Sequence, residues 1–308
     1  SLSYAEYLND PRQTKTPNDY GSFDMDRYTI FGEKKFGNME LAADLSHRTK
    51  RVEFFQFGGL SSYDTKMTQF SPRLRYVGKS GNVTNEIVTG FDFSESNRVR
   101  NSSFSLDDAT QRSAAIYFRD ELKISDARIA FGARHEKFKK KTVDPVPFTS
   151  NYDVSNSLNA WTLEGSYALQ PQLLVYAKTG RSYRIPNVDD NFFLAKPLVP
   201  QTSNDAELGA SIGSANRQLL TVKVFQHNLK NEIMFDANTF SNANLDPTKR
   251  RGIEIEASTY LTTAFKLSAM LQHVSAKFTS GPNKGNDVVL VPKNIATLRL
   301  NWLSLIHI

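Results

Sequence analysis

The sequence of 308 residues contains no cysteine. Disulfide bonds, thiolate metal sites and cysteine nucleophiles are therefore excluded. It also lacks any run of eighteen apolar residues, which excludes a transmembrane helix. Charge of one sign is not concentrated either, because the excess of 38 Lys and Arg over 32 Asp and Glu is spread along the chain. This distribution argues against a nucleic-acid partner.

What the sequence does contain is apolar residues arranged with a period of two. Ile129, Phe131 and Ala133 alternate with polar or small residues. The same alternation recurs in segments that begin at Ile87, Leu173, Ile253 and Ala296. A period of two is typical of a strand with one apolar and one polar face. Two alanine-rich segments, 39–48 and 107–123, keep this period and are also predicted to be strands.

The pattern predicts thirteen strands, at roughly residues 22–33, 38–56, 65–77, 83–95, 107–122, 127–139, 158–169, 172–183, 203–213, 217–233, 249–261, 264–278 and 291–302. Short connections alternate with long polar ones, which fall at 1–21, 57–64, 96–106, 140–157, 184–202, 234–248 and 279–290. This alternation is typical of a transmembrane β-barrel, with tight turns on one side of the membrane and long loops on the other.

An odd number of strands cannot close a bacterial barrel, and open sheet edges are not tolerated inside a membrane. The fold predicted is therefore all-β, an antiparallel up-and-down transmembrane β-barrel that is incomplete. We expect residues 1–302 to form this part of a larger barrel. Residues 303–308 read Leu-Ser-Leu-Ile-His-Ile and break the alternation. They resemble the translation of a sequencing-library adapter, so we predict a non-native tail.

One short motif suggests an enzyme. A G-x-S-x-G match is centred on Ser211, and Asp236 or Asp246 and then His273 follow in hydrolase order. The motif requires a strand, a sharp turn and a helix, whereas the residues after Gly213 favour another strand. A soluble serine hydrolase is thus a minor alternative, and we expect no enzyme. The histidines lack metal-ligand spacing, so we also predict no metal and no cofactor.

The densest basic run is formed by Lys137, Lys139, Lys140 and Lys141, where a predicted strand enters a long loop. One interpretation is a solvated strand end. The other is contact with lipopolysaccharide phosphates or with an anionic ligand, because clustered ammonium groups raise the local concentration of anions.

Four segments carry a resemblance to a known family. Residues 173–190 are similar to a strand signature y-a-x-x-x-x-g-[yf]-r-x-P-n, and 200–209 to l-k-P-e-x-s-x-x-x-E-l-G. Residues 244–256 resemble a G-i-E-i-e strand, and 291–298 a v-P-x-x-x-a-x-l strand. With all four in the correct order, the sequence resembles the TonB-dependent outer-membrane receptors over about residues 1–302.

The resemblance implies a barrel of about 22 strands with a plugged lumen in the bacterial outer membrane. It implies energised uptake of a large, scarce nutrient, most often a ferric siderophore or another iron complex. The partners implied are that ligand, the TonB complex of the full-length protein, and outer-membrane lipid and lipopolysaccharide. The plug and the TonB box are not recognisable here. A passive porin-like barrel remains the alternative.

Ligand contacts are expected in the outer loops and the upper lumen, from Arg98, Arg100, Tyr152, Tyr183, Arg184, Phe192 and Phe193. Aromatic rings can stack on the planar arms of a siderophore, and arginines can pair with its carboxylates. Ordinary loop packing is the competing interpretation for each. Gly252 is expected to permit close strand packing or a bend, and Pro186 to end a strand. Glu254 and Glu256 are expected to face the lumen.

Overall fold

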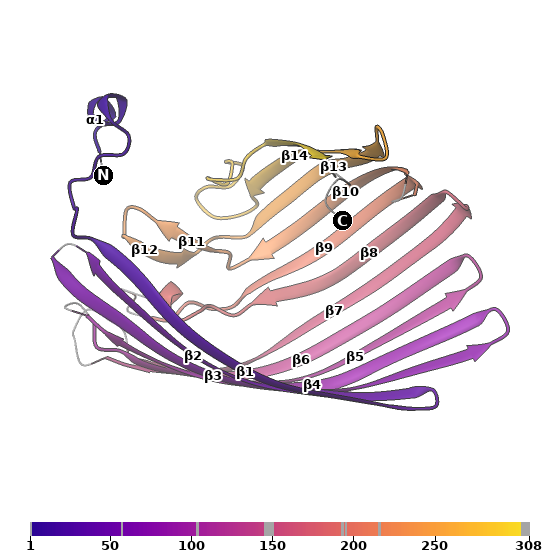
Figure 1. The fold of residues 1–308 in the computed structure, drawn as a ribbon, viewed down its shortest axis with the longest axis horizontal. Helices are drawn as coiled ribbons and strands as arrows, with labels where there is room; N and C mark the ends of the chain where they lie inside the picture. The colour runs from indigo at the N-terminus through magenta and orange to yellow at the C-terminus, as the bar shows by residue number, and fades with distance from the viewer. Residues whose placement is uncertain are drawn as a thin grey trace.

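The computed structural model describes residues 2–56, 58–102, 105–144, 151–191, 194, 196–214 and 217–302. In this part of the chain, thirteen strands form one antiparallel sheet in the order β1 to β10, then β13, β14 and β15. The sheet curves into a trough, and within the described residues β1 does not pair with β15 (Figure 1). The predicted open, up-and-down sheet of thirteen strands is confirmed.

The strands of the sheet are β1 Tyr20–Phe36, β2 Met39–Gln56, β3 Gly59–Ser80, β4 Val83–Asn101, β5 Asp108–Ile124, β6 Ala127–Val143, β7 Tyr152–Gln170, β8 Leu173–Arg184, β9 Gln201–Gly213, β10 Gln218–Lys230, β13 Thr248–Tyr260, β14 Phe265–Phe278 and β15 Asn294–Trp302. The other elements are helix α1 Tyr4–Asn9, the short helix η1 Asp189–Asn191, and a hairpin of β11 Ile233–Asp236 and β12 Ser241–Asn244. No helix in the described ranges is long and apolar enough to cross a membrane.

The connections separate the sheet into two ends. Short turns follow β1, β3, β5, β7, β9 and β13 at one end, which we call the turn end. The connections that carry η1 and the β11–β12 hairpin lie at the opposite end, the loop end (Figure 1). The predicted alternation of connections therefore holds along most of the chain.

Three predicted loops are wrong in extent, and one of them is 140–157, where β6 continues to Val143 and β7 begins at Tyr152. β2 continues to Gln56 and β3 begins at Gly59, so the loop predicted at 57–64 is largely strand. β4 likewise continues to Asn101, inside the loop predicted at 96–106. In these stretches the apolar residues are isolated, as are Leu60 and Val99, so no apolar alternation reveals the strand. Backbone pairing with the neighbouring strand is enough to extend the ladder.

The two faces of the sheet differ in chemistry. On the convex face, Ile116, Phe118, Ile129, Phe131 and Leu163 are all exposed. Neighbouring residues on each strand point to the opposite face, because side chains alternate along a strand. An exposed apolar band of this kind is typical of a surface in contact with lipid.

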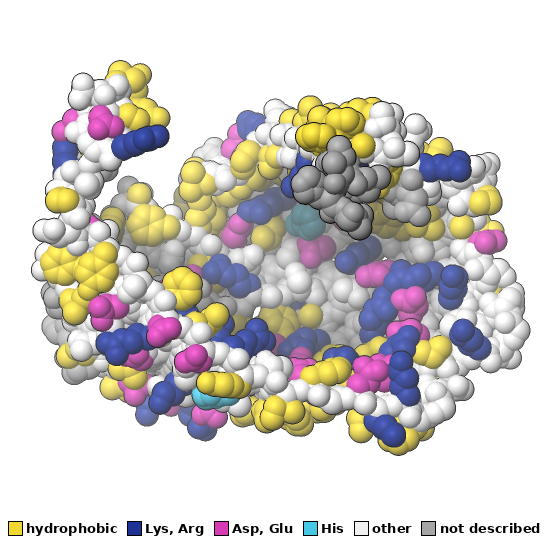
Figure 2. Space-filling model, viewed as in Figure 1, with side chains coloured by type: hydrophobic (Ala, Val, Ile, Leu, Met, Phe, Trp, Pro, Cys, Tyr) yellow, Lys and Arg dark blue, Asp and Glu magenta, His cyan; other side chains and the backbone are white. Residues whose placement is uncertain are grey.

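The concave face is polar and charged (Figure 2). Arg128 on β6 lies 2.8 Å from Glu121 on β5 and 3.4 Å from Glu164 on β7. Further along the sheet, Lys223 on β10 lies 2.6 Å from Glu254 on β13. Glu254 thus belongs to this face, as the sequence predicts. Ion pairs across neighbouring strands offset the charges of a lumen-facing wall.

The connection after β14 folds back against the concave face. Val288 packs on Val274 and Ala276 of β14, and all three side chains are buried. The Val288 N–H donates to the Ala276 carbonyl at 2.9 Å, and the Val274 N–H donates to the Lys293 carbonyl at 2.8 Å. This connection therefore continues the ladder where pairing with β15 has ended.

Candidate functional site

The candidate site lies on the concave face at the loop end, and its centre is an aromatic ring between two arginines. Tyr63 on β3 pairs in register with Arg100 on β4, and Arg98 follows two residues away on the same face. The guanidinium groups of Arg98 and Arg100 lie 5.3 and 5.2 Å from the centroid of the Tyr63 ring. These distances are those of cation–π contacts.

Arg98 also joins two connections that are far apart in sequence. Its Nη2 donates to Asp107 Oδ1 at 2.8 Å, and its Nη1 donates to Asp189 Oδ1 at 2.5 Å. The Asp107 side chain is only 3 % exposed, whereas that of Asp189 is 66 % exposed. Ser105 Oγ lies 2.9 Å from Asp107 Oδ2 and 2.7 Å from Asp144 Oδ2. Arg98 therefore has two carboxylate partners, of which Asp107 is buried and Asp189 is exposed to solvent.

The segment after β8 is held by its own side chains. β8 ends at Arg184, two residues before Pro186, as predicted. Arg184 Nη2 donates to both carboxylate oxygens of Asp190, at 3.0 and 2.9 Å. The Asn187 N–H donates to Asp190 Oδ2 at 2.8 Å, and the Asp190 N–H donates back to Asn187 Oδ1 at 2.7 Å. This segment is therefore held in a defined conformation by hydrogen bonds among its own residues.

Tyr152 and Tyr183 reach this region from β7 and β8. The Tyr152 hydroxyl accepts from Asn191 Nδ2 at 3.4 Å. The ladder between β7 and β8 ends at Trp161 and Arg181, and beyond it the Tyr183 hydroxyl donates to the Glu136 carboxylate on β6. Arg134 Nε donates to the same hydroxyl at 3.2 Å. Tyr183 thus belongs to a partly buried polar network in the wall.

Lys140 departs from the sequence interpretation. The predicted basic run divides between the two faces, because residues alternate along β6. Lys137, Lys139 and Lys141 are exposed, whereas Lys140 is 2 % exposed. Its ammonium has no hydrogen-bond partner within the described residues. The charged groups that act on it are Asp190, which favours the charged ammonium, and Arg184, which disfavours it.

Five of the seven predicted ligand residues therefore lie near one another at the loop end: Arg98, Arg100, Tyr152, Tyr183 and Arg184. Phe192 and Phe193 lie outside the described residues. Sequence reasoning missed Tyr63, because its place beside Arg100 follows from strand pairing inside two segments predicted to be loops. It also missed the acidic partners Asp107, Asp189 and Asp190. A pair of acids that follows the R-x-P-N segment after Val188 is the sequence signal for Asp189 and Asp190.

The enzyme alternative does not fit the structure. Ser211 lies within β9, where it pairs with β8 and β10, and its Oγ is 2.9 Å from Thr221 Oγ1. His273 Nδ1 is 2.8 Å from Asn294 Oδ1 instead of a carboxylate. The strand–turn–helix elbow that the motif requires is absent from this stretch of the described chain, so the hydrolase interpretation is wrong. Among the residues with described positions, no group of three or more His, Asp or Glu has a geometry that could hold a metal.

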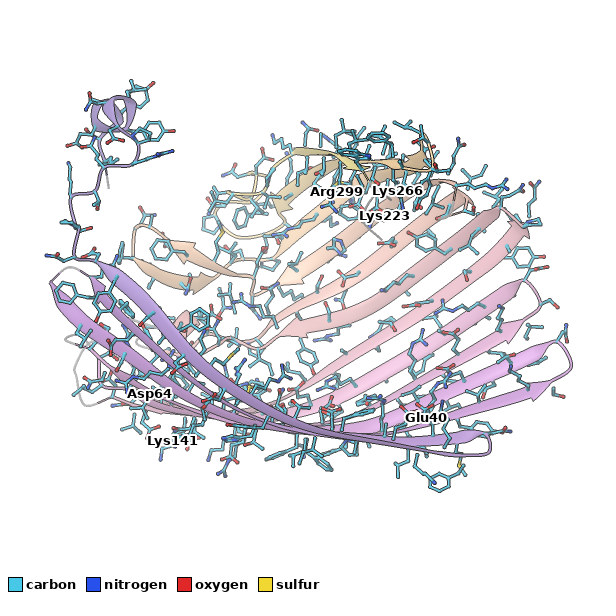
Figure 3. All side chains as sticks on the ribbon, in the orientation of Figure 1. Glu40, Asp64, Lys141, Lys223, Lys266 and Arg299 are labelled. Carbon is cyan, nitrogen blue, oxygen red and sulfur yellow. The ribbon has the colours of Figure 1, made fainter. Side chains whose placement is uncertain are left out.

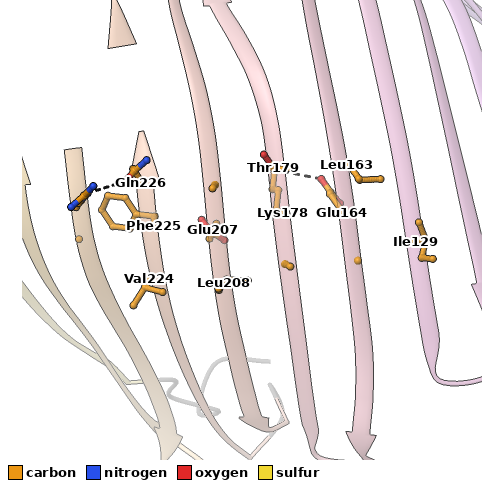
Figure 4. Close-up of a pocket in the computed structure, with 15 residues that line it drawn as sticks. Ile129, Leu163, Glu164, Lys178, Thr179, Glu207, Leu208, Val224, Phe225 and Gln226 are labelled. Atoms are coloured by element: carbon orange, nitrogen blue, oxygen red, sulfur yellow. Dashed lines mark hydrogen bonds and ion pairs between the residues drawn. The ribbon is translucent and has the colours of Figure 1, made fainter. Parts of the chain in front are cut away.

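A hollow of about 800 Å³ lies elsewhere, on the convex face (Figure 4). It is lined by the apolar side chains of Ile129, Leu163, Leu208 and Val224 on β6, β7, β9 and β10. These positions continue the exposed apolar band. The hollow therefore belongs to the outer surface of the sheet and not to the candidate site.

The comparisons with known proteins agree with this geometry. A family model described as "TonB dependent receptor-like, beta-barrel" matches residues 2–306. No curated protein matches the sequence. Several solved structures share the fold, and the chain spans about half the length of each one named below.

The ferric citrate transporter FecA, in its unliganded form, is 18% identical, with a TM-score of 0.80 over 98% of this chain and 50% of that one. The alcaligin outer-membrane receptor FauA from Bordetella pertussis is 18% identical, with a TM-score of 0.73 over 91% and 50%. The copper transporter OprC is 15% identical, with a TM-score of 0.76 over 93% and 52%. At these identities the likeness shows a shared fold.

Proposed function

Because this chain belongs to the TonB-dependent receptor β-barrel family, whose members are outer-membrane transport receptors and not enzymes, we propose that the whole protein imports a ferric siderophore or another iron complex. Uptake is energised by the TonB complex acting on the whole protein. In this arrangement the loop end faces the outside of the cell, and the turn end faces the periplasm.

The observation that carries the proposal is the Tyr63–Arg98–Arg100 group at the outer mouth of the lumen. Ferric siderophores present carboxylate, hydroxamate or catecholate oxygens together with planar arms. Guanidinium groups bind such oxygens with directed, charge-assisted hydrogen bonds, and an aromatic ring offers a stacking surface.

The ion pairs of Arg98 suggest how a ligand binds. Asp189 is exposed, so water can solvate its carboxylate when an anionic ligand takes its place on Nη1. Asp107 is buried and stays on Nη2, where it fixes the orientation of the guanidinium. Binding therefore exchanges one anion for another and leaves no buried charge without a partner.

Uptake of radioactive iron tests the proposal, in cells that express the whole receptor and lack other iron receptors. Ferric citrate, a ferric hydroxamate and a ferric catecholate are offered separately, with and without TonB. We expect TonB-dependent uptake of one of them. Arg98→Gln should raise its half-saturating concentration about tenfold or more, because a charge-assisted hydrogen bond contributes about 1.5–3 kcal/mol.

Arg112→Gln is the matched control, because Arg112 is an exposed β5 residue that pairs with Glu95 away from the mouth. It should leave uptake unchanged. Uptake that continues without TonB would instead indicate a passive porin. Transport of copper but of no iron complex would contradict the proposed ligand class.

A further inference from the structure

Lys140 on β6 is a buried cation whose neighbours along the strand face the other way. Figure 3 shows Lys141 on the convex side of the sheet, and side chains alternate along a strand, so Lys140 points to the concave side. The residue is 2 % exposed, and its Nζ has no hydrogen-bond partner within the described residues. A buried ammonium without a partner is unfavourable, so a carboxylate that reaches it would stabilise this part of the wall.

Helix η1 brings a carboxylate close to Lys140. Thr142, two residues along β6, pairs in register with Tyr152 of β7. The Asn191 amide of η1 donates to the Tyr152 hydroxyl at 3.4 Å, so η1 lies against the wall at this level. Asp190, the preceding residue of η1, is buried, and its charge acts on the Lys140 ammonium. In the part of the chain that the structure describes, no ion pair joins these two side chains.

Asp190 is bonded to a different cation. Arg184 Nη2 donates to both of its carboxylate oxygens, and the Arg184 side chain is 45 % exposed. The Asp190 side chain is only 12 % exposed. One largely buried carboxylate therefore has two cations near it: an exposed guanidinium that it bonds, and a buried ammonium that it does not.

The backbone of Asp190 is fixed independently of these cations. Its N–H donates to Asn187 Oδ1 at 2.7 Å, and its carbonyl accepts from Asn242 Nδ2 at 3.2 Å. Rotation about the side-chain bonds can therefore change the partner of the carboxylate while the segment stays in place. The Asn187 N–H, which donates to the carboxylate, can then donate to water, because Asn187 is exposed.

We propose that Lys140 is the second partner of Asp190: when an anionic oxygen of the imported ligand binds Arg184, the carboxylate turns to Lys140. Two anions on one guanidinium repel each other, so the ligand displaces the carboxylate. Water can solvate the exposed Asp189 after its exchange on Arg98, but the more buried Asp190 needs another cation. The inference rests on the proposed function for the ligand, whereas the two partners of Asp190 can be tested without one.

Hydrogen exchange tests the two partners in the whole receptor, purified in detergent without ligand. The exchange rate over residues 185–191 is measured for Arg184→Gln, for Lys140→Met and for both substitutions together. Each single variant leaves Asp190 one cation, so exchange should stay within about threefold of wild type. The double variant leaves it none, and exchange should rise about tenfold or more beyond the product of the two single effects.

Lys139→Met is the matched control, because Lys139 is exposed on the convex face and pairs with Asp153 at 3.2 Å. Combined with Arg184→Gln, it should give no more than the product of the single effects. Adding Asp190→Asn to the double variant should restore slow exchange, because no carboxylate is left to pair. Exchange that stays fast in this triple variant, or a double variant that shows only the product, would overturn the proposal.

A crystal structure of the Arg184→Gln receptor tests the rotation directly and needs only one substitution, at an exposed residue. We expect the Asp190 carboxylate to lie within hydrogen-bonding distance of Lys140 Nζ. A carboxylate that stays on the Asn187 N–H, away from Lys140, would overturn the proposal.

Binding of the ferric complexes is measured on the same samples. Lys140→Met should raise the dissociation constant about tenfold or more, whereas Lys139→Met should change it by less than about twofold. If no ferric complex binds while Arg184 and Lys140 remain coupled, the proposed ligand class fails and the two partners of Asp190 stand. If a ferric complex binds the wild type and Lys140→Met equally well, the exchange is wrong and the proposed function stands.

Discussion

Gly252 and Gly165 show how differently two strand glycines act in the same sheet. A Cβ added at Gly252 would lie 2.6 Å from the His273 carbonyl oxygen and 2.5 Å from Phe225 Cζ. A Cβ added at Gly165 would meet nothing within 4 Å. Close packing at Gly252, predicted from its place in a family motif, is thus confirmed.

The contrast gives a matched pair of substitutions. Gly252→Ala forces a backbone carbonyl to move, so we expect it to destabilise the barrel by about 1–3 kcal/mol. Gly165→Ala should be close to neutral. Thermal unfolding of the whole receptor in detergent measures both. Equal melting temperatures for the two variants would contradict the packing argument.

Arg98 allows a prediction that is independent of any ligand. Arg98→Gln leaves Asp107 buried without its cation, and breaking a buried pair costs about 3–5 kcal/mol. We expect faster hydrogen exchange at the loop ends of β4 and β5. Arg112→Gln breaks an exposed pair worth at most about 1 kcal/mol, and exchange should stay unchanged. Similar exchange in both variants would show that the Arg98 pair does not order these ends.

These residues also show how far the candidate site could be predicted. Arginines and tyrosines next to long connections are visible in the sequence, and five of the predicted ones lie at the loop end. Their acidic partners cannot be identified from the sequence, because Arg98 and its partner Asp189 are 91 positions apart. Contacts of that separation depend on which strand ends the folded sheet brings together.

At the scale of elements, Asn244 joins two loops. The Asn244 side-chain amide donates to the carbonyls of Val199, at 3.1 Å, and Asn231, at 2.8 Å. Its Oδ1 accepts from the Val199 N–H at 2.9 Å. One side chain at the end of β12 therefore ties the connection after β8 to the connection after β10.

Asn244→Ala should release both connections at once. Each lost hydrogen bond contributes about 0.5–1.5 kcal/mol, and the carbonyls left behind can find water. We expect faster hydrogen exchange near Val199 and across β11 and β12, with no change in the sheet. Asn238→Ala removes one side-chain bond, from Nδ2 to Asp236 Oδ1, and keeps the bond that the backbone N–H of residue 238 donates, so it should affect the hairpin tip alone. Faster hydrogen exchange confined to the hairpin in both variants would show that Asn244 does not join the two connections.

The elements differ in how well the sequence predicts them, for a physical reason. Where one face of a strand is apolar, the period of two reveals it, even in the alanine-rich segments that became β2 and β5. Beyond the apolar band the apolar residues are isolated, and the signal disappears although the ladder continues. The β11–β12 hairpin, with four residues in each strand, is too short to show a period at all.

At the scale of the whole molecule, the sheet has two free edges. β1 and β15 are the outermost strands, and every residue of both is exposed. Each edge presents backbone N–H and C=O groups that no strand in the described residues pairs. In hydrocarbon, such groups cost several kcal/mol each, which is why spanning sheets are closed.

The 308-residue chain expressed alone should therefore not form a compact barrel in detergent. Unboiled samples are expected to migrate in a gel like boiled ones, whereas the whole receptor should migrate faster before boiling than after. The reason is the free edges and not weak pairing within the sheet, because the thirteen strands form continuous ladders. Fast migration of the unboiled chain that is lost on boiling would contradict this. It would mean that the edges meet each other or those of a second copy, and that the trough closes without further strands.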